Sequence, residues 1–293
     1  MKRRPVKRKA VRRKPMKRRP MHRRTAGRRD PSGSRAAHRS LVRPASPLAR
    51  VSVIIPVMNE GSTLPALLRE VKKLKPSLLE ILVVVNGSTD GSREIAERAG
   101  ARVFFYEEAL GHDVGRSIGA RHAAGDILLF LDADMVLTAR QLRPFIRAVG
   151  SGTDVALNAY LGPLRRRHTH PVVLAKHALN LALGRPDLRG ASLTTVPHAL
   201  SRRALEAVGA EALAVPPKAQ AMAVHHGLRV EPAALVPVGK LNRLRGRRGA
   251  AEGQDEVGRL IVGDHLEAVA WLTEATDMRG GFTDLNRMRH AVR

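Results

Sequence analysis

Gly125-Asp126-Ile127-Leu128-Leu129-Phe130-Leu131-Asp132-Ala133-Asp134 is the stretch that decides the fold of this 293-residue chain. Its unbroken apolar run, 127–131, is typical of a strand that is buried on both faces, as in a parallel sheet. Two carboxylates follow directly, Asp132 and Asp134, and ligands of open α/β sheets lie beyond the carboxyl ends of the strands. Carboxylates together with substrate phosphates are the usual ligands of Mg²⁺ and Mn²⁺. Asp-x-Asp by itself is more typical of a solvated turn, so a metal site depends on support from the surrounding sequence.

That support begins upstream, where three further strands are expected. The β-branched and apolar runs 51–56, 80–85 and 102–105 predict strands, and the segments 64–74, 92–99 and 113–124 predict helices between them. Strands that alternate with single helices indicate βαβ crossovers and a parallel sheet. The sequence therefore predicts an α/β fold class.

Polar loops follow three of the predicted strands, at 59–60, 86–90 and 132–134. The carboxyl ends of parallel strands meet at one edge of a sheet, so we expect these loops to converge there. Their acids and amides suit a ribose, a base edge or a metal. No Gly-x-Gly-x-x-Gly follows the first strand and no Walker A sequence is present, which argues against dinucleotide and P-loop chemistry.

The composition predicts one large globular domain behind a basic tail. The chain is 43% hydrophobic, lacks cysteine, which excludes thiolate metal sites, and has a formal net charge of +26. Residues 1–50 hold 20 of the 52 Lys and Arg residues but one of the 26 acids, so the remainder carries a net charge of +7. No run approaches the ~20 apolar residues of a membrane span, and no apolar segment follows the basic N-terminus. We expect a soluble, cytoplasmic protein, or one that is peripheral at the inner membrane face.

The tail, residues 1–49, is predicted to be disordered, because like charges at this density repel and cannot bury a core. It could contact nucleic acid or an anionic membrane by charge alone. A solubilising extension, or a translation start placed too early, is an equally weighted alternative.

Four motifs in order, 51–60, 86–92, 115–126 and 131–134, resemble those of glycosyltransferase family 2. The resemblance implies a GT-A-like, Rossmann-type domain with a mostly parallel sheet over 50–293. Its nucleotide-sugar-binding half would be 50–135, and its acceptor half and C-terminal helix 136–293. The implied activity is metal-dependent transfer of a sugar from a nucleoside-diphosphate sugar to an unknown acceptor hydroxyl, in cell-envelope or polysaccharide synthesis.

The resemblance also implies a set of site residues. Glu60 and Asn86 would lie near the nucleobase and ribose, and Arg116 near the diphosphate. Mn²⁺ or Mg²⁺ would be held on the diphosphate by the two aspartates of the opening stretch. Asn86 stands where the family usually has aspartate, which weakens any inference about the base. The full donor-binding set implied is Pro56, Asn59, Glu60, Asn86, Ser88, Asp90, Arg116, Asp132 and Ala133, with Asp132 and Asp134 as metal ligands.

The acceptor half departs from the family pattern where a catalytic base is expected. A capping box at 138–141 predicts a helix to about 149. Residues 154–160 predict a strand, and 172–183 are an apolar, helix-length segment more typical of a core helix than of a membrane contact. Residues 201–209 resemble the short helix that follows the acceptor-side strand in the family. Inverting family members carry a Glu-Asp pair at the start of a later helix, where this chain has Pro216-Pro217. Proline can begin a helix but cannot accept a proton. The substitutes near that helix are Glu211, His198, His225 and His226.

Two C-terminal segments complete the predicted site. Residues 240–253 form a basic loop that could close over a diphosphate or an anionic acceptor, or could be a solvated surface loop. An amphipathic helix follows at about 255–276. In it, His265 is a candidate metal ligand and Glu267, like His198, a candidate catalytic residue. The alternative is that Asp264 and Glu267 form a capping box that restarts a helix interrupted at Gly263, with His265 on the solvated side.

Two hypotheses from other classes remain open at this point. One is a non-catalytic nucleotide-sugar-binding protein that has lost its base. The other is a nucleic-acid- or envelope-binding protein whose basic tail acts and whose fold is only a scaffold.

Overall fold

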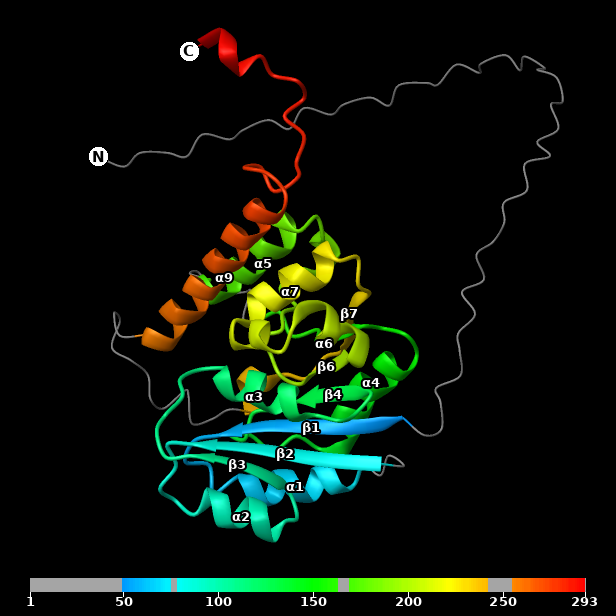
Figure 1. Ribbon diagram of the computed structural model, residues 1–293, viewed down its shortest axis with the longest axis vertical. Coiled ribbons are helices and arrows are strands. Elements are labelled where there is room, and N and C mark those ends of the chain that lie inside the picture. Colours follow the sequence, from blue (N-terminus) through cyan, green and yellow to red (C-terminus); the bar gives the residue numbers. More distant parts are fainter. Residues whose placement is uncertain (1–48, 75–77, 163–168, 242–254, 293) are drawn as a thin grey trace, which may run out of the picture. The chain divides into compact units, whose positions relative to one another are not determined.

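The computed structural model of the protein describes residues 49–74, 78–162, 169–241 and 255–292 (Figure 1). The predictions for the tail and for most of the basic loop, 242–253, lie outside the described residues. Within the described ranges, no helix is long and apolar enough to cross a membrane.

The described part of the chain contains a seven-stranded sheet of order β3-β2-β1-β4-β6-β5-β7. The first four strands in space are parallel, β6 runs antiparallel to both of its neighbours, and β7 is parallel to β5. The predicted α/β fold with a mostly parallel sheet is therefore confirmed. The strands are β1 (Arg50–Val57), β2 (Leu78–Asn86), β3 (Arg102–Tyr106), β4 (Ile127–Phe130), β5 (Val155–Asn158), β6 (His198–Ser201) and β7 (Val230–Ala234).

The apolar run of residues 127–131 supplies β4, the central strand of this sheet. All four residues of β4 are buried, and β4 lies between β1 and β6. Val51 is in register with Ile127 of β4 and with Leu79 of β2, so apolar side chains on neighbouring strands form continuous rows on each face. Burial on both faces is what the unbroken apolar runs predicted.

Helices cover both faces of the sheet. The core on one face is built with α1 (Leu64–Lys72), α2 (Ser92–Arg98) and α4 (Ala139–Gly150), and α4 begins with the predicted capping box. The core on the other face is built with α3 (Val114–His122), α6 (Arg202–Val208) and α7 (Pro216–His225).

Helix α3 packs tightly on β1 through Gly119. A Cβ atom at this position would clash with the side chain of Ile54, so only glycine allows this approach. The approach brings the N-terminal turn of α3, which carries Arg116, to the carboxyl edge of the sheet.

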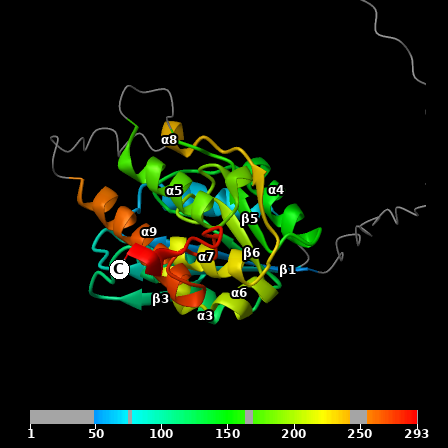
Figure 2. The same cartoon turned by 90° about the horizontal axis from the view of Figure 1, so that it is seen from above.

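A further layer is formed by α5 (Pro171–Ala182) and α9 (Glu256–Ala275), which pack with α7 around Leu179, Ala221 and Ala268. Figures 1 and 2 both show α9 alongside α5 and α7. The remaining described elements are the short helices η1 (Pro186–Leu188), η2 (Glu211–Ala214), α8 (Val238–Leu241) and η3 (Arg289–Val292).

The C-terminal helix differs from one predicted alternative. Asp255 caps α9 and accepts a hydrogen bond from the Gly258 amide at 2.8 Å, and the helix runs without interruption through Gly263. The helix restart at Asp264 is therefore wrong. The orientation expected with it is also wrong, because His265 is 3% exposed whereas Leu266 is 67% exposed. Packing against two helices, α5 and α7, decided which side of α9 is buried.

Candidate active site

The first two polar loops meet at the carboxyl edge of the sheet, as predicted. The Asn59 amide donates to Ser88 Oγ at 3.0 Å, and Asn59 Oδ1 accepts from the Thr89 amide at 2.8 Å. The Gly61 amide donates to Asp90 Oδ2 at 2.7 Å. Reciprocal bonds of this kind hold both loops in one conformation, which prepares a binding surface before a ligand arrives.

The third loop is joined to the first by Thr63. Its hydroxyl lies 2.5 Å from the carbonyl oxygen of Ala133, to which it donates, and 3.3 Å from Glu60 Oε2. Glu60 and Ala133, two of the expected donor-binding positions, are therefore held on either side of one threonine.

Asn86 and Pro56 occupy supporting positions. Asn86 is 6% exposed; its Nδ2 donates to the Val57 carbonyl at 3.2 Å, and its Oδ1 accepts from the Leu110 amide at 3.1 Å. Pro56, within β1, lies against Gly115 at the start of α3. In the structure the Asn86 amide thus joins β1 to the loop that precedes α3.

Arg116 is the centre of charge at this edge. Its guanidinium, 4% exposed, forms ion pairs of 2.9 Å with Asp113 and with Asp132. Burial alone would lower the pKa of Arg116, but the charges of Asp132 and Asp113 outweigh it and raise that pKa. Arg116 therefore stays charged and holds the carboxylate of Asp132 in one orientation.

The carboxylates around Arg116 suit a divalent cation. Asp132 and Asp134 are both partly buried and flank the buried Ala133, and the charge of Asp134 also acts on Arg116. With Asp113, three carboxylates thus act electrostatically on one guanidinium. Among the described residues no group of three or more His, Asp or Glu could hold a metal ion. Two carboxylates would therefore have to share a cation with substrate oxygens, as is usual for Mg²⁺.

His198 lies beneath this cluster in β6. Its ring is 1% exposed and stacks on Phe130 at 5.0 Å between ring centroids, and its Nδ1 lies 3.3 Å from the Thr195 carbonyl oxygen. Burial and the nearby charge of Arg116 lower the pKa of His198 to about 3. An imidazole with so low a pKa is a poor proton acceptor at neutral pH.

The two α9 candidates make other contacts in the structure. His265 points into the helix packing with its Nδ1 2.6 Å from the Ile261 carbonyl oxygen, and burial lowers its pKa to about 4. Glu267 is half exposed and forms a 3.0 Å ion pair with Lys218 of α7. His265 does not form a three-ligand cluster with Asp132 and Asp134 in the described structure.

The first turn of α7, where a catalytic carboxylate was expected, contains no acidic residue. Pro216 and Pro217 do begin α7, as predicted. The rings of His225 and His226, at its far end, lie 5.5 and 6.5 Å from that of Trp271 in α9. Glu211 is exposed in η2.

Besides Asp113, two charged residues near the site were missed from the sequence. Asp264 of α9 is partly buried, and burial together with the charge of Asp113 raises its pKa to about 6. Lys176 of α5 donates to Thr195 Oγ1 at 2.7 Å, and burial and the charge of Arg116 lower its pKa to about 8. The one signal for Lys176 in the sequence is its charge within an otherwise apolar, helix-length segment, and the spacing of Asp264 and Glu267 predicts a helix cap.

Comparison with known proteins gives the family context of this site. The sequence model described as "Glycosyl transferase family 2" matches residues 52–198, which is half of the chain. A relative from Salmonella paratyphi B, an undecaprenyl-phosphate 4-deoxy-4-formamido-L-arabinose transferase, is 31% identical over 120 residues. That alignment covers 38% of this chain and 37% of the relative, so the chain matches little more than a third of the curated relatives' length.

Solved structures of glucosyl-3-phosphoglycerate synthase from Mycobacterium tuberculosis have a similar fold. The complex with Mn²⁺, uridine diphosphate and phosphoglyceric acid is 19% identical, with a TM-score of 0.54 and coverage of 80% of both chains. The complex with uridine diphosphate is 20% identical, with a TM-score of 0.56 and coverage of 76% of this chain and 80% of that one. At these identities the similarity concerns the fold alone.

Proposed function

The chain belongs to glycosyl transferase family 2, and from this premise we propose that it transfers a sugar from a nucleoside-diphosphate sugar to an acceptor hydroxyl, using Mn²⁺ or Mg²⁺. The observation that carries the proposal is the buried Arg116, ion-paired to Asp132 at 2.9 Å and influenced by Asp134. A pair of carboxylates, one of them held in place by a buried arginine, is suited to a divalent cation whose coordination a diphosphate completes.

The donor is proposed to bind across the three interlocked loops. Bonds between Asn59 and Ser88 and between Gly61 and Asp90 keep the nucleotide-facing loops ordered, so binding loses little conformational entropy. Arg116 holds Asp132 in place for the cation. When bound, the cation would stabilise negative charge on the departing diphosphate.

The acceptor base is proposed to be a carboxylate of α9. Glu267 is one candidate from the sequence, and its ion pair with Lys218 places it near the start of α7. Asp264 is the other candidate, since it is partly buried and close enough to Asp113 for their charges to interact. Buried His198 would instead support the turn that contains Thr195, because it is 1% exposed and lies against that residue's carbonyl oxygen.

For the acceptor and the pathway we propose only a broad class. The Salmonella relative is a transferase named for undecaprenyl phosphate, and the mycobacterial complexes contain Mn²⁺, uridine diphosphate and phosphoglyceric acid. These names support a nucleoside-diphosphate donor with a divalent metal, and a role in cell-envelope or polysaccharide synthesis.

The test is a thermal-shift screen of nucleoside diphosphates with and without Mn²⁺, followed by a donor-turnover assay. A ligand that binds the native state raises the melting temperature, so a Mn²⁺-dependent shift with one nucleoside diphosphate is expected. Release of that diphosphate from its sugar donor would distinguish a transferase from a binding protein. Absence of a Mn²⁺-dependent shift with every nucleotide would contradict the metal-dependent mechanism.

A further inference from the structure

One buried turn, residues 192–195, contacts cations from both halves of the molecule. Arg116 Nη1 donates to the Leu193 carbonyl at 3.4 Å, and Lys176 Nζ donates to Thr195 Oγ1 at 2.7 Å. The turn is closed by a 3.0 Å bond from the Thr195 amide to the Ser192 carbonyl. Lys176 on α5 and Arg116 on α3 therefore both donate hydrogen bonds to this four-residue turn.

The two cations differ in how their charges are balanced. Arg116 has the carboxylates of Asp113 and Asp132. Within the described ranges no carboxylate forms an ion pair with Lys176, and the charged neighbour that affects its pKa is Arg116, which lowers it. Removing an ammonium group from water without a counter-charge is unfavourable. A protein tolerates such a group more readily where a bound anion supplies the missing charge.

The buried side-chain amides of Asn180 and Gln220 hold the turn and the residues before it in place. Asn180 Nδ2 donates to the carbonyls of Arg189 and Ala191 at 2.8 and 3.0 Å, and Gln220 Oε1 accepts from the Leu193 amide at 2.9 Å. Gln220 Nε2 in turn donates to Asn180 Oδ1 at 2.7 Å. These side chains are 1% and 0% exposed.

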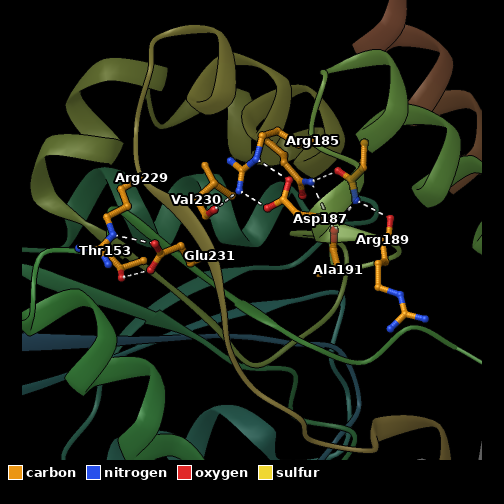
Figure 3. Close-up of polar contacts among 10 residues, drawn as sticks. Thr153, Arg185, Asp187, Arg189, Ala191, Arg229, Val230 and Glu231 are labelled. Atoms are coloured by element: carbon orange, nitrogen blue, oxygen red, sulfur yellow. Dashed lines mark hydrogen bonds and ion pairs between the residues drawn. The ribbon is translucent and has the colours of Figure 1, made fainter. Parts of the chain in front are cut away.

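A second set of bonds fixes the beginning of the same segment. Arg185 pairs with Asp187 and donates to the Val230 carbonyl of β7 at 2.9 Å. Figure 3 shows this network around Arg185, Asp187 and Ala191, with the side chain of Arg189 directed away from it. The segment that presents Thr195 is thus tied to α5, α7 and the sheet, so Lys176 meets a preformed partner.

We propose that Lys176 and the hydroxyl of Thr195 form a phosphate-binding subsite beside Arg116. Lysine binds phosphate as a point charge, and threonine hydroxyls donate hydrogen bonds to phosphate oxygens. Thr195 Oγ1 accepts from Lys176, which leaves its own proton for an anion. The subsite deepens the proposed function and rests on it: the phosphate belongs either to the donor's diphosphate or to an acceptor that carries a phosphate.

The test uses inorganic phosphate and the full-length protein. Isothermal titration would compare the native protein with Lys176→Met, Lys176→Arg and the exposed control Lys72→Met. A hydrogen bond to a charged group is worth enough to expect about tenfold or more weaker phosphate binding in Lys176→Met. Lys176→Arg should retain most of the affinity and Lys72→Met all of it.

Unliganded melting curves separate this role from a structural one. Because Lys176 lacks a carboxylate partner in the described structure, Lys176→Met should melt at or above the temperature of the native protein when no anion is present. Equal phosphate affinity in Lys176→Met and native protein would overturn the subsite, as would the absence of phosphate binding to either. Acetate bound as tightly as phosphate would overturn the assignment of ligand class.

The source of the phosphate is decided by repeating the titration with saturating uridine diphosphate and Mn²⁺. If phosphate still binds, the subsite serves the acceptor; if the nucleotide excludes phosphate and Lys176→Met weakens the nucleotide, it serves the donor. Failure of the proposed function would be recognised separately, as nucleotide binding that does not depend on Mn²⁺ while Lys176-dependent phosphate binding remains.

Discussion

At the scale of single residues, the site is defined by which charges are paired. Arg116 is held between Asp113 and Asp132, and both ion pairs measure 2.9 Å. An arginine presents planar donors that fix a carboxylate in orientation as well as in position. The pairing explains how a buried arginine and a partly buried aspartate can occupy the edge of the sheet without an unfavourable isolated charge.

Asp134→Asn is expected to abolish Mn²⁺-dependent nucleotide binding and to leave the fold intact. The amide retains the shape of the side chain but removes a negative charge that a divalent cation needs. Titration of uridine diphosphate with and without Mn²⁺ measures the effect, and a melting curve checks the fold. Asp126→Asn at the opposite end of β4 is the matched control. Unchanged Mn²⁺-dependent affinity in Asp134→Asn would remove this residue from the metal site.

Asp264→Asn is expected to raise the melting temperature at pH 7 and to have no effect near pH 4. Burial and the charge of Asp113 raise the pKa of Asp264 from 3.8 to about 6. Between these two pH values the native state therefore holds a proton that the unfolded state has lost. Native stability from this group is present below pH 4 and declines as the pH rises through 6. Melting curves from pH 4 to 8 measure it, with Glu274→Gln at an exposed position of the same helix as the control. A variant less stable at pH 7 would contradict this environment.

At the scale of elements, α9 shows why one helix pattern permits two orientations. Its apolar residues fall on more than one side, and one alternative from the sequence placed His265 on the solvated side. In the structure Ala268 and His265 face inward with Leu272, and Leu266 is exposed. Small residues lie at the contact, where Ala268 of α9 packs with Ala221 of α7 and Leu179 of α5.

His265→Ala is expected to lower the free energy of unfolding by about 1–3 kcal/mol, because a buried ring and its bond to the Ile261 carbonyl are lost. Mn²⁺ affinity should not change. Leu266→Ala, at an exposed position of the same helix, should change stability by about 0.5 kcal/mol or less. Urea unfolding and a metal titration distinguish the outcomes. Lost Mn²⁺ affinity at normal stability would return His265 to the metal site.

At the scale of the whole molecule, the charge distribution separates the tail from the body. Residues 1–50 carry most of the excess positive charge, and β1 begins at Arg50. The β1 strand is paired on both sides, with β2 and β4, within the described part of the chain. The fold of the body can thus be accounted for by contacts among residues beyond the tail.

Deleting residues 1–48 is expected to leave the melting temperature and Mn²⁺-dependent nucleotide binding unchanged. A segment so rich in like charges cannot bury enough apolar surface to stabilise a fold. The measurements are a melting curve and a nucleotide titration of the shortened chain at two salt concentrations. A melting temperature that falls by several degrees would show that the tail takes part in the fold.

The sequence by itself determined the α/β sheet, its central strand and the three loops at its edge. These features follow from local rules: buried strands read as apolar runs, and parallel strands deliver their following loops to one edge. The segments 51–56, 80–85 and 102–105 became β1, β2 and β3 for this reason.

Only the tertiary structure decided which charges meet. Lys176 and Arg116 are 60 residues apart and converge on a turn that lies 16–19 residues beyond Lys176, held there by Asn180 and Gln220. Likewise, the inward direction of His265 and the nearness of Asp264 to Asp113 depend on how α9 packs on α5 and α7. The spacing of apolar residues in the sequence predicts that a helix has a buried side. Which residues occupy it, and which charges they leave unbalanced, is decided by the surfaces that the helix meets.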